Sequence, residues 1–132
     1  MKLEITFPHP DSKLGLNGSL PTDPRAASAR NRARIGLKIK TRNAAYLRAL
    51  AALKDVPQRN FPARQVSVCW VYKGMRPDVD GVVTRLKPLI DGCAKAFGIN
   101  DRELELGRVR RVHSLGKDAG SVILTFDTEP LI

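Results

Sequence analysis

Cysteines and long apolar runs are scarce in this sequence. Cys69 and Cys93 are the two cysteines among 132 residues, and they form no CxxC pair and have no clustered histidine beside them. Buried free thiols are therefore favoured over a disulfide or a zinc site. No apolar run approaches the ~20 residues that span a bilayer, and the apolar part of MKLEITFPHP is too short for a signal peptide. These absences predict a cytoplasmic protein that does not span a membrane.

Acidic side chains are also few, and their scarcity is informative. The chain has 23 Lys and Arg against 13 Asp and Glu, which gives a formal net charge of +10. Residues 1–60 hold 12 basic and 4 acidic side chains, whereas residues 61–132 hold 11 and 9. A positive surface attracts polyanions, and nucleic acid is the commonest such partner. Solubility alone would also account for the excess, so charge does not decide between the two.

One folded domain over residues 1–132 is expected from length and composition. The chain is 42% hydrophobic and 27% charged, as in ordinary globular proteins, so a folded chain is favoured over a disordered one. A chain of this size buries roughly two thirds of its unfolded surface and supports a single core.

Periodicity and turn signals predict the element order β-α-β-α-β-β. Apolar residues alternate with polar ones in KLEITF and ARQVSVCWVYK, which is typical of half-buried strands. Thr22 and Asp23 before Pro24 are a helix-start pattern, Pro88 should kink or restart the second helix, and Gly107 is a candidate bulge. The predicted strands are 2–7, 63–73, 102–113 and 121–128, the last two joined by the turn SLGKDAG, and the predicted helices are 24–54 and 82–97.

The first predicted helix has two distinct sets of side chains. Apolar residues at helical spacing predict its packing side: Ile35, Ile39, Tyr46, Leu50 and Leu53. A basic stripe with four-residue spacing occupies a different face: Arg30, Arg34, Lys38 and Arg42. Acidic partners at i+4 are almost absent, so the stripe suits an anionic ligand, although a solvated surface would also explain it. Gly36 and Thr41 weaken the middle of the helix, where a break is possible.

Two aspartates stand together in the segment MRPDVDG, at the end of the second predicted strand. In extended backbone, Asp78 and Asp80 would point to one side about 6–7 Å apart, a spacing that divalent cations bridge. Asp101 could supply a third carboxylate if its strand pairs beside the strand that ends at Tyr72. Asp91 is a fourth candidate, which an ion pair with Lys87 at i to i+4 also explains.

A pair of aspartates is weak evidence by itself, because such pairs also cap helices and stabilise turns. Asp80 lies where a helix N-cap is expected. The combination is more telling: carboxylates gather where a strand meets a helix, a lysine follows, and the surrounding chain is basic. A phosphodiester must be neutralised before water attacks it, which requires metal held by acids within a cationic surface.

Residues 76–104, RPDVDGVVTRLKPLIDGCAKAFGINDREL, resemble the signature region of the RusA-type Holliday-junction resolvases. Matched by position, Asp78 and Asp80 are the paired aspartates, Lys87 is the motif lysine, Asp91 is the helix acid and Asp101 is the third metal-site aspartate. The sequence departs from the family pattern in three places. Gly81 replaces Asn, Asn100 replaces the first acid of the terminal pair, and the spacing from Asp80 to Lys87 follows the longer variant of the motif.

The resemblance implies a homodimeric α/β (α+β) fold, with a small mixed, mostly antiparallel sheet and helices packed on one side. It also implies a bacterial or phage-encoded endonuclease that resolves four-way DNA junctions by paired nicks during recombination and repair. Asp78, Asp80 and Asp101 would hold Mg²⁺, or Mn²⁺, and Lys87 would face the scissile phosphate.

Several cations are candidate contacts to DNA: Arg76, Arg85, the stripe of Arg30, Arg34, Lys38 and Arg42, and Arg108, Arg110 and Arg111. Trp70 and Tyr72 lie on the apolar face of a strand, so core packing is favoured over base stacking, and neither His9 nor His113 is given a role. Two alternatives stay open. One is a basic nucleic-acid-binding protein without catalysis, and the other is a metal-dependent nuclease acting on other branched DNA.

Overall fold

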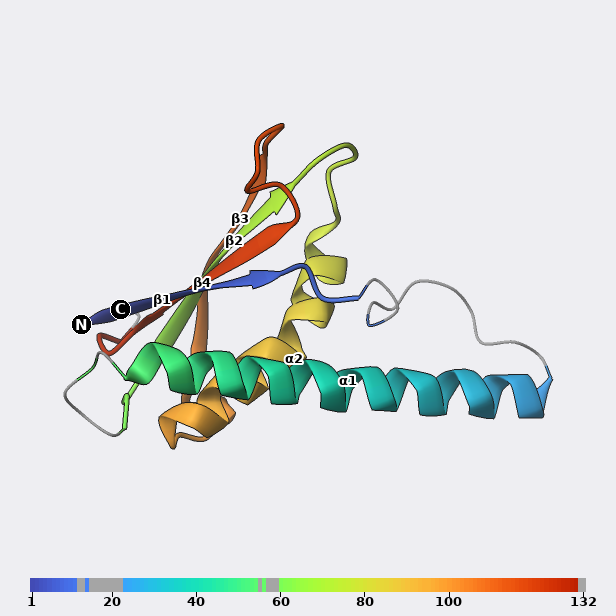
Figure 1. Cartoon of the computed structure of the whole chain (residues 1–132), viewed down its shortest axis with the longest axis horizontal. Coiled ribbons are helices and arrows are strands. Elements are labelled where there is room, and N and C mark those ends of the chain that lie inside the picture. The colour runs from blue at the N-terminus through green and yellow to red at the C-terminus, as the bar shows by residue number, and fades with distance from the viewer. Residues whose placement is uncertain (12–13, 15–22, 55, 57–59, 131–132) are drawn as a thin grey trace.

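Two helices cover one face of a four-stranded sheet in the computed structural model of the chain (Figure 1). The structure describes residues 1–11, 14, 23–54, 56 and 60–130. Its elements are β1 (Lys2–Pro8), α1 (Pro24–Leu53), β2 (Gln65–Tyr72), α2 (Val79–Phe97), the short 3-10 helix η2 (Asp101–Glu103), β3 (Glu105–His113) and β4 (Ser121–Asp127). The predicted element order and the packing of helices on one side are confirmed.

The strand order is β1-β4-β2-β3. Strand β4 pairs antiparallel with both β1 and β2, whereas β2 pairs parallel with β3, so the sheet is mixed and mostly antiparallel, as expected. The register between β2 and β3 shifts between Val66 and Val68, which confirms the bulge at Gly107. Strands β3 and β4 follow each other in sequence but are not neighbours. Their connecting turn crosses the end of β2, where the Gly120 amide donates to the Val71 carbonyl at 3.0 Å.

The core lies between the helices and one face of the sheet. Alternation in β2 places Val66, Val68 and Trp70 in this core with at most 2% exposure, as predicted. The facing surfaces are apolar side chains from β1, β4 and both helices: Ile5, Phe7, Val122, Leu124, Phe126, Ala45, Ala49, Leu53, Val82, Leu86, Leu89, Cys93 and Phe97. No helix in the described part of the chain is both long and apolar enough to cross a membrane.

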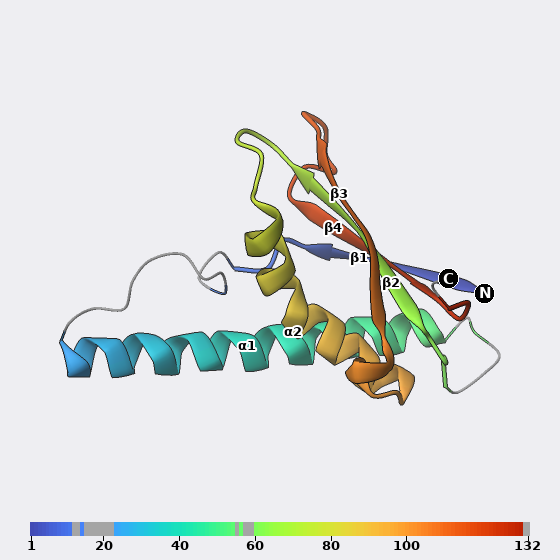
Figure 2. The ribbon, with the colours of Figure 1, turned by 180° about the vertical axis from the view of Figure 1, so that it is seen from behind.

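Helix α1 is unbroken from Pro24 to Leu53, so neither Gly36 nor Thr41 interrupts it. Asp23 caps its N-terminus by accepting a hydrogen bond from the Arg25 amide at 3.0 Å, while Thr22 lies outside the described residues. The first half of the helix projects beyond the sheet and α2 (Figures 1 and 2). No other described part of the chain packs there against the predicted apolar side.

The predicted packing side of α1 is consequently wrong over its first half, and it is also wrong at Leu50, which is 37% exposed. Ile35 and Ile39 are 49% and 45% exposed, because the core ends before it reaches them. The side chains that α1 buries are small or near its C-terminus: Ala45, Ala49 and Leu53. The face on which Lys38 and Arg42 stand is the one that looks toward α2, since both side chains line a hollow between the two helices.

Small residues let the helices cross closely. A Cβ atom built on Gly92 of α2 would lie 2.3 Å from the backbone oxygen of Arg42 and 2.8 Å from the Cβ of Ala45. Real Cβ atoms do not approach backbone this closely, so this crossing depends on glycine. Helix α2 also runs through Pro88 without restarting, and its ribbon bends part-way along (Figures 1 and 2). A bend is the expected effect of a proline that removes one backbone donor inside a helix.

Gly92→Ala is expected to destabilise the protein by about 2 kcal/mol or more, because the added methyl group meets backbone that cannot rotate away. Gly81→Ala is the matched control in the same helix, where an added Cβ meets nothing within 4 Å. There, alanine should stabilise by about 0.5–1 kcal/mol through helix propensity. Urea unfolding measures the free energy of unfolding of both variants. Equal changes in the two variants would contradict the close crossing of the helices at Gly92.

The two cysteines are free, but only Cys93 is fully buried; Cys69 is half-buried on the sheet face away from the helices. Burial raises the pKa of the Cys93 thiol to about 12. We therefore expect one thiol to react with a disulfide reagent in the native protein and the second to react only after unfolding. Counting reactive thiols with and without denaturant tests this, and Cys69→Ser should leave no fast-reacting thiol.

Candidate functional site

The parallel pairing of β2 and β3 separates the predicted metal ligands. Asp101 precedes β3, whose first residue lies beside Gln65 at the beginning of β2. Asp78 follows the end of β2, so the 19 residues of α2 stand between the two positions, a span of roughly 27 Å at 1.5 Å per residue. Among the described residues, no group of three or more Asp, Glu, His or Cys side chains could hold a metal ion. The expected set of Asp78, Asp80 and Asp101 is therefore not gathered within one chain.

Asp78 and Asp80 lie at the start of α2. Asp78, not Asp80, is the N-cap residue; its backbone is extended and its side chain makes no capping hydrogen bond. Asp80 lies inside the first helical turn, so the expected extended pair is not formed, because residues two apart on a helix do not face each other. Both side chains are exposed. Their charges suit the positive end of the helix dipole.

The structure instead brings Asp91 and Asp101 together. Burial is the main cause that raises the pKa of Asp91, followed by a side-chain hydrogen bond and charge repulsion from Asp101. Lys87 and Arg42 oppose this rise through their positive charges. Both Asp101 and Asp91 were expected from the sequence as candidate carboxylates of one site, the latter also as an ion-pair partner of Lys87. Spacing did not predict their direct contact, because that contact depends on the turn after α2.

Asn100 explains why that turn brings Asp101 back toward α2. Its side-chain oxygen caps η2 by accepting a hydrogen bond from the Arg102 amide at 3.1 Å. The RusA pattern has an acid at this position. Here Asn100 lines the same hollow as Asp91 and Asp101 without adding a charge.

A hollow between the helices surrounds this acid pair with cations. One part, about 520 Å³, is lined by Arg42, Asp91, Lys95 and Asp101, among others. An adjoining part, about 370 Å³, shares Arg42 and Asp91 and adds Lys38, Thr84 and Lys87. We call the two together the α1–α2 cleft, defined by Lys38, Arg42, Lys87, Asp91, Lys95 and Asp101. Its formation follows from the close crossing at Gly92, the residue after Asp91.

The donor chemistry of the cleft fits Mg²⁺ better than the predicted set does. Magnesium is usually held by one or two carboxylates, with waters and substrate phosphates filling the other positions. Asp91 and Asp101 line one hollow and supply two carboxyl groups that influence each other's charge. Two adjacent carboxyl groups resist double ionisation, and they either share a proton or require a cation between them.

The predicted DNA contacts are divided among several surfaces. Lys38, Arg42 and Lys87 meet in the α1–α2 cleft, while Arg30 and Arg34 lie on the projecting half of α1. The others lie elsewhere: Arg76 is exposed before α2, Arg108 and Arg110 are exposed on β3, Arg111 donates to the Pro77 carbonyl at 3.0 Å, and Arg85 lines a separate hollow.

His9 was given no role from the sequence, yet it belongs to that separate hollow. Its ring stacks on Trp70 with centroids 4.2 Å apart, and its Nε2 lies 2.9 Å from the Ser121 carbonyl oxygen. Trp70 is a core residue, as predicted, with 1% exposure. The meeting of His9 with Trp70 could not be predicted from spacing, because 61 positions separate them in the sequence.

Comparison of the chain with protein-family models, with curated proteins and with solved structures gave no match in any of the three. The resemblance to RusA-type resolvases therefore depends mainly on the pattern of residues 76–104. The chemistry of the cleft is the main structural indication of a function.

Asp91→Asn is expected to stabilise the folded protein increasingly as the pH rises. The raised pKa of Asp91 means that the folded state holds this proton more tightly than the unfolded state. Wild-type stability therefore falls as the pH increases from the ordinary carboxyl range through the raised pKa, and asparagine removes that loss. Urea unfolding in EDTA, from about pH 4 to about pH 8, measures the difference. The raised pKa of Asp91 would be contradicted if the gain in free energy of unfolding became smaller with rising pH, or if Asp78→Asn gave the same gain.

Proposed function

We propose that this protein is a Mg²⁺-dependent endonuclease that acts on branched DNA, with the four-way junction as the expected substrate. The observation that carries the proposal is the acid pair Asp91–Asp101 inside the basic α1–α2 cleft. Phosphodiester hydrolysis needs this combination, because cations hold the DNA while carboxylates act at the reacting phosphate. The resemblance of residues 76–104 to RusA-type resolvases supports the same reaction class.

Each cleft residue has a part in the proposal. Arg42 and Lys87 both act electrostatically on Asp91, so a phosphate drawn to them is brought to the acid pair. Lys38 extends the row of cations from Arg42 toward the projecting half of α1. Asp91 and Asp101 would hold Mg²⁺, which when bound lowers the pKa of a coordinated water and offsets charge on the phosphoryl oxygens.

Helix α1 is the proposed approach for the DNA. Its projecting half carries basic side chains and no acidic residue in its first turn. Exposed cations of this kind raise the rate of encounter with DNA and make binding dependent on salt. In this proposal the protein works in the cytoplasm of a bacterium, encoded by the host or by a phage. A two-fold homodimer would present one cleft to each of two equivalent junction strands.

Asp78 and Asp80 need a separate explanation within this proposal. Since α2 stands between them and Asp101, a site that uses all three requires carboxylates from two copies of the chain. A site made of Asp91 and Asp101 needs one copy. These two arrangements predict different behaviour for mixed variants.

The alternative function is DNA binding without catalysis. It is favoured by the exposure of Asp78 and Asp80, which serve the start of α2 as cap and first-turn residues. Under this alternative, replacing any of the candidate carboxylates would change only the affinity for DNA.

The deciding experiment is a nicking assay on a synthetic mobile four-way junction, with and without Mg²⁺. Asp91→Asn and Asp101→Asn should each lower nicking on the order of 100-fold or more, because each removes a proposed metal-holding group. Junction binding should persist or tighten, since a negative charge near the phosphates is lost. Asp118→Asn, in the exposed turn between β3 and β4, is the matched control and should retain full activity.

Wild-type protein that binds junctions but never nicks them would overturn the catalytic proposal and leave the binding alternative. Preferential cutting of linear duplex would count against the junction as substrate. Loss of nicking in Asp78→Asn, restored by mixing with Asp101→Asn, would identify a site shared between two copies.

A further inference from the structure

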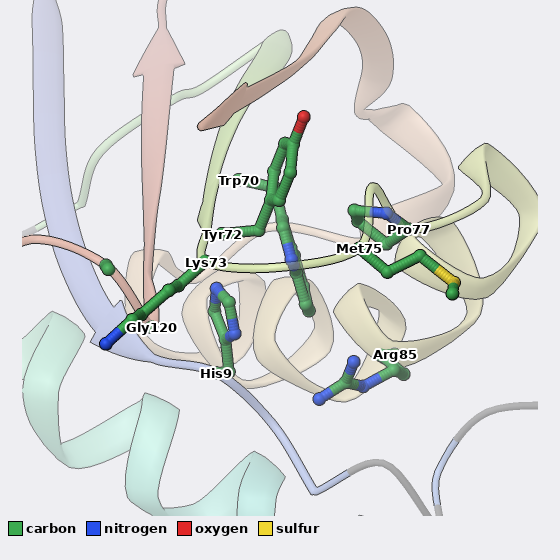
Figure 3. Close-up of a pocket in the computed structure, with 9 residues that line it drawn as sticks. His9, Trp70, Tyr72, Lys73, Met75, Pro77, Arg85 and Gly120 are labelled. Carbon is green, nitrogen blue, oxygen red and sulfur yellow. The ribbon is translucent and has the colours of Figure 1, made fainter. Parts of the chain in front are cut away.

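A second hollow lies at the other end of α2 from Asp101, and its residues come from four distant parts of the sequence. His9 follows β1, and Arg85 comes from α2 (Figure 3). Trp70 and Tyr72 lie at the end of β2 with Lys73 directly after it, and Gly120 precedes β4. The hollow has a volume of about 350 Å³ and a mouth edged by the fully exposed Met75. This volume is in the range of small-ligand sites.

The floor of the hollow is the indole of Trp70. The ring of His9 stacks against it at an interplanar angle of 21°, and the guanidinium carbon of Arg85 lies 4.8 Å from the ring centroid. Figure 3 shows His9 and Arg85 flanking the indole. The main-chain amide of His9 donates to the Gly120 carbonyl at 2.9 Å. This hydrogen bond fixes the backbone of His9 beside Trp70 without a bound ligand.

Arg85 is bound incompletely by the protein. One terminal nitrogen donates to the Pro10 carbonyl, but its buried Nε has no hydrogen-bond partner among the described residues. A buried donor without an acceptor is costly and uncommon. Burial also lowers the pKa of Arg85, an effect that the charge of Asp11 partly offsets.

The charge of the hollow is positive. Lys73 joins Arg85 in its lining, whereas none of the described residues that line it is Asp or Glu. Tyr72, Met75 and Pro77 add apolar surface beside the two cations. Two cations next to aromatic and aliphatic walls match a ligand that is anionic at one end and flat or apolar at the other.

We propose that this hollow binds a nucleotide through its phosphate, with Arg85 and Lys73 contacting the phosphate and Tyr72 and Met75 contacting the sugar or base. The ligand is a nucleoside monophosphate unit, either free or at the end of a DNA strand. No residue is shared between this hollow and the α1–α2 cleft. The site therefore goes beyond the proposed cleavage reaction and does not require it.

Trp70 is the one tryptophan in the chain, so its emission reports on this hollow. The protein is titrated in EDTA at low salt while its tryptophan fluorescence is recorded. Thymidine 5′-monophosphate should change the fluorescence until the site is saturated, inorganic phosphate should change it less, and thymidine should not change it. Lys73→Gln, at an exposed position, should weaken nucleotide binding about tenfold or more, because it removes a charge-assisted contact. Lys117→Gln is the matched control, an exposed lysine of the nearby turn that does not line the hollow.

Short oligonucleotides with and without a 5′-phosphate distinguish the two sources of the ligand. Tighter binding of the phosphorylated strand supports a strand end, and binding of the free nucleotide alone supports a nucleotide ligand; both support the site. The proposed site would be overturned if nucleotide caused no saturable change in fluorescence. It would also be overturned if thymidine bound as tightly as thymidine 5′-monophosphate, or if Lys117→Gln weakened nucleotide binding as much as Lys73→Gln. Because no metal is present, the result is independent of the nicking assay.

Discussion

The contact between Gly92 and the backbone of α1 is the constraint on which the cleft depends. Without a side chain at this position, α2 approaches Arg42 and Ala45 closely enough to leave Asp91 half-buried beside α1. Burial then makes the charge of Asp91 expensive, and Arg42 and Lys87 compensate only in part. The same contact that packs the helices therefore creates a carboxyl group poised to accept a proton or a cation.

Helix α2 divides the chemistry of the protein between its two ends. Its C-terminal half presents Asp91 toward Asp101, whereas its beginning carries the exposed Asp78 and Asp80, with Arg85 one turn further on at the second hollow. The basic side chains have different roles in the α1–α2 cleft and in the second hollow. Those in the cleft partly neutralise carboxylates. Arg85 and Lys73 instead line a hollow to which the structure's described residues add no acidic side chain, although Asp11 acts electrostatically on Arg85.

Local patterns predicted the features that depend on neighbours in sequence. Alternation in β2 identified Val66, Val68 and Trp70 as core, because the period of a strand decides which face each side chain takes. The element order and the bulge at Gly107 followed from similar short-range signals. The predicted burial of Ile35 and Ile39 was wrong, because helical spacing shows that two side chains share a face but not whether another element covers that face. The direction of β3 relative to β2 was likewise not encoded in a spacing.

The sequence by itself determined a basic chain with the element order β-α-β-α-β-β and with aspartates concentrated around its second helix. The mixed sheet with helices on one side was an implication of the resemblance to RusA-type resolvases, and the structure confirms it. Only the tertiary structure decided which aspartates meet. Parallel pairing of β3 with β2 places Asp101 near the beginning of β2, and the cap at Asn100 turns it toward Asp91. The partner of a side chain depends on strand direction and on long-range packing, and residues 91 and 101 come together through both.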